Sequence, residues 1–186
     1  MDFELEIRQE SPQDFDQVFH LIKDAFEKEI YTDHQEQFLV ERLRKSKAFV
    51  SELSLVAEQD SKIVGYILLT KIKLVPKDGG VIIPENVDQF LALAPVAVHP
   101  EYQNQGIGAA LIQEAHKKAK SLNFKAVILL GHADYYPRFG YQLCKDFGIV
   151  LPFDVPEENC LALELFPGAL AAFSRTVVQY PTEFFD

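Results

Sequence analysis

The residues best placed for chemistry are the paired glycines Gly106 and Gly108, which follow an apolar stretch and open a helical pattern. The first turn of a helix leaves several backbone N–H groups without a partner, and the helix dipole adds partial positive charge there. Because neither glycine has a side chain, an anion can approach the backbone closely. Residues 103–109 therefore predict a cradle for a phosphate or diphosphate group.

The apolar stretch before the glycines, residues 90–98, has strand character but contains Pro95. Because a proline has no N–H to donate to a sheet, we expect a gap or a bulge at this point. The interruption would leave backbone N–H and C=O groups free to pair with an extended ligand that carries amides. Pantetheine is such a ligand, so the sequence describes a phosphate cradle next to an open strand edge.

The rest of the chain predicts the elements that position this unit. Ser11 and Pro12 mark a helix start, because serine caps helices and proline suits the first helical position. Further helices are expected over residues 35–45 and 106–122, a short helical turn over 135–139, and strands at 5–7, 53–58, 63–75, 126–130, 147–150, 161–165 and 176–179. This order, with one β-α-β unit in the middle, predicts a single α/β domain over residues 1–186.

Two motifs carry a resemblance to a known family. The spacing Gln103-x-x-Gly106-x-Gly108 resembles the acetyl-CoA motif of the GNAT superfamily of N-acetyltransferases, [QR]-x-x-G-x-[GA]. The run YPRFGY, residues 136–141, looks like the superfamily's Y-x-x-x-G-[FY] signature. Segments on both sides also resemble the YhbS-like subgroup of predicted acetyltransferases, so the likeness covers nearly the whole chain. It implies the GNAT fold, a mixed and mostly antiparallel central sheet that is split in a V and flanked by helices.

The resemblance also implies an activity, the direct transfer of an acetyl group from acetyl-CoA to a primary amine. Backbone atoms of Val96, Ala97 and Val98 would bind the pantetheine arm, and the Val98 N–H would stabilise negative charge on the thioester oxygen. The pyrophosphate would be held by the amides of Gln103, Asn104, Gln105, Gly106, Ile107, Gly108 and Ala109. Tyr136 stands at the family position of the acid that protonates the leaving thiolate. The alternatives for it are a packed core aromatic, or Tyr135 as the working tyrosine.

The base that removes the proton of the amine is not singled out. Many relatives carry a glutamate on the central strand, where residues 90–94 of this chain are wholly apolar. The candidates, each of which could equally be a solvated loop charge, are Glu27, His34, Glu36, Glu85 and Asp88. A proton path through water is also open. Nearby, His132 is a candidate ligand contact, and Asp134 would either bond to pantetheine or cap the short helix.

Composition limits the other classes. The chain of 186 residues has a formal net charge of −10 and no dense basic patch, which argues against a nucleic-acid partner. It contains no apolar run of transmembrane length, no signal peptide and two cysteines, Cys144 and Cys160, without metal-site spacing, so we expect a cytoplasmic protein with no bound metal. The expected partners are acetyl-CoA and a small-molecule or peptide amine, and a homodimer is open because relatives often form dimers.

Two other functions compete with acetyl transfer. A catalytically silent sensor or scaffold would bind acetyl-CoA and transfer nothing, which the missing strand glutamate favours. A dinucleotide site is the third reading, but the glycine loop lacks the third glycine and the acidic residue that such sites use.

Overall fold

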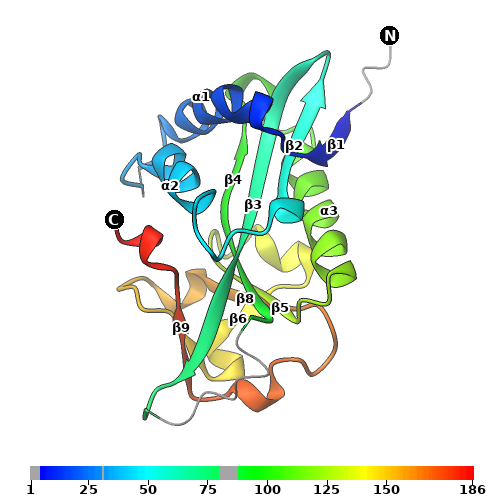
Figure 1. Ribbon diagram of the computed structural model, residues 1–186. Coiled ribbons are helices and arrows are strands. Elements are labelled where there is room, and N and C mark those ends of the chain that lie inside the picture. Colours follow the sequence, from blue (N-terminus) through cyan, green and yellow to red (C-terminus); the bar gives the residue numbers. More distant parts are fainter. Residues whose placement is uncertain (1–4, 31, 80–87) are drawn as a thin grey trace.

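The computed structural model describes residues 5–30, 32–79 and 88–186. Its sheet runs in the order β1-β2-β3-β4-β5-β8-β6, and β9 pairs with both β3 and β7. The strands are β1 Glu6–Gln9, β2 Ser54–Gln59, β3 Lys62–Pro76, β4 Phe90–Val98, β5 Ala126–Leu130, β6 Gln142–Leu143, β7 Ile149–Val150, β8 Cys160–Glu164 and β9 Thr176–Gln179. The helices are α1 Phe15–Phe26, α2 Glu36–Leu43 and α3 Ile107–Ser121. In Figure 1, α1 and α2 lie on one side of the long strands and α3 lies on the other.

The predicted hairpin of β2 and β3 is confirmed, as is the mixed and mostly antiparallel character of the sheet. Asp60 and Ser61 connect the two strands with φ angles of 52° and 61°, the left-handed conformation that a tight hairpin turn requires. Parallel pairing is found between β4 and β5 and between β7 and β9.

Strand β4 is interrupted where the proline predicted it. Its register with β3 shifts between the pairs Ile67–Val96 and Leu69–Leu93, so Ala94 and Pro95 together face one residue of β3. On its other edge β4 runs parallel to β5 only from Phe90–Ala126 to Ala92–Ile128. Beyond Ala92 the two strands part, and this is the split in the sheet.

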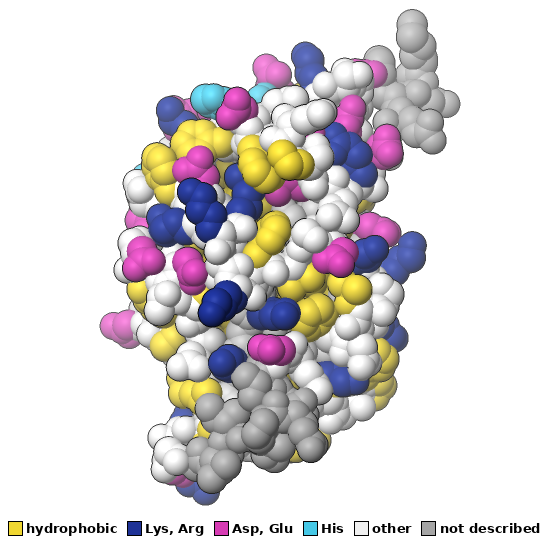
Figure 2. Space-filling view, in the orientation of Figure 1, with side chains coloured by type: hydrophobic (Ala, Val, Ile, Leu, Met, Phe, Trp, Pro, Cys, Tyr) yellow, Lys and Arg dark blue, Asp and Glu magenta, His cyan; other side chains and the backbone are white. Residues whose placement is uncertain are grey.

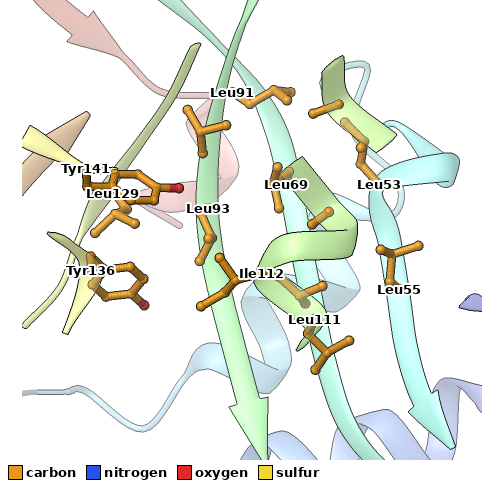
Figure 3. Packing of buried hydrophobic residues seen from close by; sticks show 14 of the residues in the cluster. Leu53, Leu55, Leu69, Leu91, Leu93, Leu111, Ile112, Leu129, Tyr136 and Tyr141 are labelled. Atoms are coloured by element: carbon orange, nitrogen blue, oxygen red, sulfur yellow. The ribbon is translucent and has the colours of Figure 1, made fainter. Parts of the chain in front are cut away.

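The face that carries α3 has a continuous apolar core. Leu111, Ile112, Ala115 and Ala119 of α3 are fully buried, at the spacing of one helical stripe. They pack against leucines of β2, β3, β4 and β5, and Tyr136 and Tyr141 close the same cluster at the β5 end (Figure 3). Burying each large aliphatic side chain contributes roughly 1.5–3 kcal/mol, so this cluster fixes α3 on the sheet.

The opposite face has two cores. One joins α1 and α2 to the upper part of β2, β3 and β4, and the other joins β5, β8 and β9 to the lower part of β3. Phe184, near the carboxyl end of the chain, packs against both. Glu183 precedes Phe184 in the chain, and its backbone oxygen accepts a hydrogen bond from Arg42 Nε of α2 at 3.1 Å. This bond attaches the carboxyl-terminal segment to α2.

Some sequence expectations need adjustment. The strand predicted over residues 147–150 is only Ile149–Val150, because Cys144–Phe147 forms a 3-10 turn. The two-residue strand β6 was not predicted. At the amino end, Ser11 precedes a 3-10 turn of Pro12–Asp14 before α1 begins, and Asp14 accepts a hydrogen bond from the Ser11 backbone N–H at 2.7 Å.

Candidate active site

The split leaves one edge of β4 without a partner strand. The His99 N–H donates to the Val64 oxygen of β3 at 2.9 Å, and Val98 lies opposite Gly65. Because backbone groups alternate in direction along a strand, the N–H and C=O of Ala97 also face β3, whereas those of Val96 and Val98 face away from it. This narrows the expected pantetheine contacts to Val96 and Val98.

The Val98 carbonyl on that open edge already has a partner. The Gln103 side-chain amide donates to it at 3.2 Å. This bond attaches the glycine loop to the end of β4, and it leaves the Val98 N–H and both backbone groups of Val96 for a ligand.

The glycine loop presents a row of free amides. The first helical hydrogen bond of α3 runs from the Ala110 N–H to the Gly106 oxygen at 3.0 Å, and the N–H groups of residues 103–109 donate to no described residue. Gly106 caps the helix with a φ of 84°, a conformation that costs other residues about 1–2 kcal/mol. Residues 103–106 are exposed, so these amides are accessible to an anion at the positive end of α3.

Gly108 leaves room in the first turn of the same helix. A Cβ atom added at Gly108 would lie 3.5 Å from Val98 Cγ2 and 3.6 Å from the Tyr135 hydroxyl oxygen. These are ordinary van der Waals distances, so the space between α3, β4 and Tyr135 is one that a side chain would fill. The absence of a side chain there keeps the backbone accessible, which fits a diphosphate bound across the turn.

Tyr136 is held in a cage of aromatic rings. Its side chain is 7% exposed and packs edge-on against the rings of Tyr135 and Tyr141, at centroid distances of 5.2 and 5.6 Å. Its hydroxyl has no hydrogen-bond partner among the described residues, and it is not one of the fully enclosed unpartnered oxygens. In Figure 3 the hydroxyl points toward the carboxyl-terminal end of β4. Burial raises the pKa of this phenol above its ordinary value, which keeps it protonated at neutral pH.

The position of the Tyr136 ring depends on a glycine that the sequence did not single out. A Cβ atom at Gly131 would lie 2.3 Å from Tyr136 Cε2 and 2.8 Å from Cδ2, closer than two carbon atoms can approach. Asn159 holds this backbone in place, because its side-chain amide donates to the Gly131 oxygen at 2.9 Å. Gly131 directly follows the buried strand β5, but its need for clearance shows only in three dimensions.

Tyr141, which packs against Tyr136, forms a hydrogen bond with His116 that the sequence did not predict. The Tyr141 hydroxyl and His116 Nε2 are 2.8 Å apart. Burial lowers the pKa of His116 to about 4, so this ring is neutral at physiological pH. The pair anchors the aromatic cage to α3 and offers no charged group to the site.

Two further candidates, His132 and Asp134, shortly precede the tyrosine pair in the chain. Asp134 and His132 are exposed, and the Asp134 carboxylate neither caps the short turn Tyr136–Phe139 nor bonds to a described residue, so its pantetheine contact stays a prediction. Tyr135 rather than Tyr136 has its hydroxyl beside Gly108.

The structure does not single out one of the candidate residues as the base that deprotonates the amine. Glu27 and Asp88 are exposed, and Glu85 lies outside the described residues. The His34 Nδ1 atom is 3.0 Å from the Phe26 oxygen, which closes the loop between α1 and α2. Glu36 has an enclosed oxygen without a partner, and burial raises the pKa of its carboxyl group.

The described residues do not favour a cysteine nucleophile or a metal centre. Burial raises the pKa of the Cys144 thiol to about 12 and also raises that of Cys160, which makes both poor nucleophiles. Within residues 5–30, 32–79 and 88–186 there is no group of three His, Cys, Asp or Glu side chains that could hold a metal ion. No helix in this part of the chain is long and apolar enough to cross a bilayer. On the face in Figure 2, basic and acidic side chains lie interspersed.

Comparison with known proteins identifies related acetyltransferases. Residues 15–141 match the profile of the acetyltransferase (GNAT) family. The uncharacterized N-acetyltransferase YjhQ of Escherichia coli (strain K12) is 36% identical over 128 residues, which are 67% of this chain and 66% of YjhQ. The uncharacterized N-acetyltransferase YhbS of the same strain is 30% identical over 138 residues, or 74% of this chain and 73% of its own length.

Solved structures show the same fold. The crystal structure of YhbS from Escherichia coli in complex with CoA superposes with a TM-score of 0.85 at 24% identity, over 100% of this chain and 94% of that one. A GNAT family acetyltransferase from Brucella melitensis in complex with acetyl-CoA has a TM-score of 0.77 at 27% identity, over 98% and 99% of the two chains.

Proposed function

Because the chain belongs to the acetyltransferase (GNAT) family, we propose that it transfers an acetyl group from acetyl-CoA directly to the primary amine of an acceptor. The main support for the proposal is that two sets of backbone groups without hydrogen-bond partners among the described residues lie next to each other. The free amides of residues 103–109 suit a diphosphate, and the outward-facing groups of Val96 and Val98 suit the amides of pantetheine. The two surfaces are consecutive in the chain, as the two parts are in coenzyme A.

The residues present fit the chemistry of the transfer. A neutral amine attacks the thioester carbonyl carbon, and the Val98 N–H is a donor for the oxygen on which negative charge develops. The carbon–sulfur bond then breaks, and the thiolate of coenzyme A takes a proton from the Tyr136 hydroxyl. The buried site keeps this phenol protonated until the thiolate forms. A thiolate that leaves into the same buried site would likewise be more basic than in water, which favours its taking the proton.

The amine loses its proton to water in this proposal, because no base stands out among the described residues. The Tyr136 oxygen, which gave its proton to the thiolate, regains one from water, so the products are the acetylated amine and coenzyme A. We propose that the acceptor is a small-molecule or peptide amine. We also propose that the chain forms one domain, is located in the cytoplasm and can form a homodimer. Nucleic acid and membranes are not expected as partners.

The test is acceptor-dependent release of coenzyme A. The protein is incubated with acetyl-CoA and a panel of polyamines, aminoacyl compounds and lysine peptides, and both free coenzyme A and the acetylated product are measured by chromatography and mass spectrometry. We expect at least one amine to be acetylated, and Tyr136→Phe to lower kcat much more than it weakens acetyl-CoA binding. Tight acetyl-CoA binding with no product from any amine would favour the sensor or scaffold instead.

A further inference from the structure

The hydroxyl of Tyr135 lies at the junction of the two candidate binding surfaces. Its oxygen is 3.6 Å from the position of a Cβ at Gly108, and Val98 Cγ2 is 3.5 Å from the same point. The side chain is half-buried, and its hydroxyl bonds to no described residue. A free donor thus stands next to the unpaired amides of the first turn of α3.

The ring that carries this hydroxyl is fixed from several sides. The Arg138 guanidinium lies 4.5 Å above the ring centroid, and Phe139 packs against it at 5.4 Å. Its plane is at 89° to that of Tyr136, so the two neighbouring tyrosines are held in different orientations. A hydroxyl held in this way loses little conformational entropy when it binds a ligand.

The glycine loop lacks the charge that its expected ligand requires. Residues 103–109 contain no lysine or arginine, and the whole chain has a formal charge of −10. A diphosphate diester brings two negative charges into this field. Arg138 is the cation that the structure places beside Tyr135, and its charge would offset part of the repulsion.

We propose that the Tyr135 hydroxyl donates a hydrogen bond to the diphosphate of acetyl-CoA bound at α3, and that Arg138 orients the Tyr135 ring and supplies positive charge there. The inference rests on the proposed function. The two adjacent tyrosines then have different roles, because Tyr135 binds the diphosphate and Tyr136 donates a proton to the thiolate sulfur.

The test compares two donors in calorimetry and in steady-state kinetics, acetyl-CoA and S-acetylpantetheine, which lacks the diphosphate. Tyr135→Phe removes one hydrogen bond to a charged group, so we expect its Kd and KM for acetyl-CoA to rise about tenfold. The same variant should bind S-acetylpantetheine as the unaltered protein does. Arg138→Gln should weaken acetyl-CoA binding about threefold to fivefold at low salt and less at high salt. Tyr136→Phe is the matched control, in which kcat falls and Kd changes little.

Three results are decisive. An unchanged Kd for acetyl-CoA in Tyr135→Phe would overturn the assignment. An equal loss with both donors would place the hydroxyl on the pantetheine arm and overturn it as well. If the unaltered protein bound neither donor, the proposed function itself would fail, which is a different outcome from either of these.

Discussion

Replacing Gly131 with alanine would place a methyl group against the ring of Tyr136. The added carbon would be 2.3 Å from Cε2 and 2.8 Å from Cδ2 of that ring, and 2.9 Å from Leu129 Cδ1. Carbon atoms in contact are normally about 3.5–4.0 Å apart, so the ring must move by more than about 1 Å. It cannot move freely, because Tyr135 and Tyr141 pack edge-on against it.

The displacement has a cost in stability and a cost in rate. Overpacking of a core by one carbon costs about 1–3 kcal/mol, so we expect the free energy of unfolding to fall by this amount. A misplacement of about 1 Å at a reacting group can lower a rate by about 100-fold, and we expect kcat to fall toward this limit. The affinity for acetyl-CoA should change little, because the nearest atoms to the added carbon belong to Tyr136 and Leu129 and not to the glycine loop or the free edge of β4.

The assay is a double-mutant cycle. Urea unfolding, calorimetry with acetyl-CoA and turnover with an accepted amine are measured for Gly131→Ala, Tyr136→Phe and the double variant. If the alanine acts through the hydroxyl, it should lower kcat far less when Tyr136 is already phenylalanine. Gly148→Ala is the control, because its Cβ would lie 2.4 Å from Ser174 Oγ, in contact with residues outside the candidate site. Equal rate losses for Gly131→Ala in both backgrounds would show that the alanine does not act through the Tyr136 hydroxyl.

Two further variants probe the cradle and the aromatic cage. Gly106→Glu and Gly106→Gln share the strain of the 84° φ angle, so the difference between their affinities isolates the effect of the added charge. The repulsion between a glutamate and a phosphate about 5 Å apart is worth about 3 kcal/mol, so calorimetry should show roughly 100-fold weaker acetyl-CoA binding for the glutamate than for the glutamine variant. Equal affinities would argue against a phosphate bound at the glycine loop. The pKa of His116 falls from its ordinary 6.5 to about 4 on folding, so the unfolded chain binds more protons between these values and stability is lost as the pH falls below 6.5. His116→Gln, which can still bond to Tyr141, should reduce the stability difference between about pH 7 and pH 5 by at most about 2 kcal/mol in urea unfolding, and an unchanged difference would contradict the burial of a neutral ring.

The sequence was sufficient for features that depend on local chemistry. Pro95 predicted the interruption of β4 because a missing N–H acts on its own strand, and the strand is interrupted there. The glycine loop predicted a helix entry with unpaired amides, and Gly106 caps α3 in the left-handed conformation. Ser11 and Pro12 likewise marked where the first helical segment begins.

Features that depend on distant residues were less accessible. The parting of β4 and β5 after Ala92 follows from pairing between segments far apart in the chain, and two-residue strands such as β6 have too short a pattern to read. Which of two adjacent tyrosines faces Gly108 depends on the geometry of a single turn, which periodicity does not resolve. The clearance at Gly131 depends on how Tyr136 packs back onto it, so no sequence pattern marked it.

Amide chemical shifts during a titration with coenzyme A would show which backbone groups bind the cofactor. In ¹⁵N-labelled protein, we expect the largest changes at the N–H groups of Gly106, Gly108, Val96 and Val98, because these groups donate to no described residue. The amide of Ala97 lies between two of them but faces β3, so its shift should change much less. Changes centred elsewhere, or equal changes along the whole of β4, would contradict the proposal that unpaired backbone groups of the glycine loop and the split strand bind the cofactor.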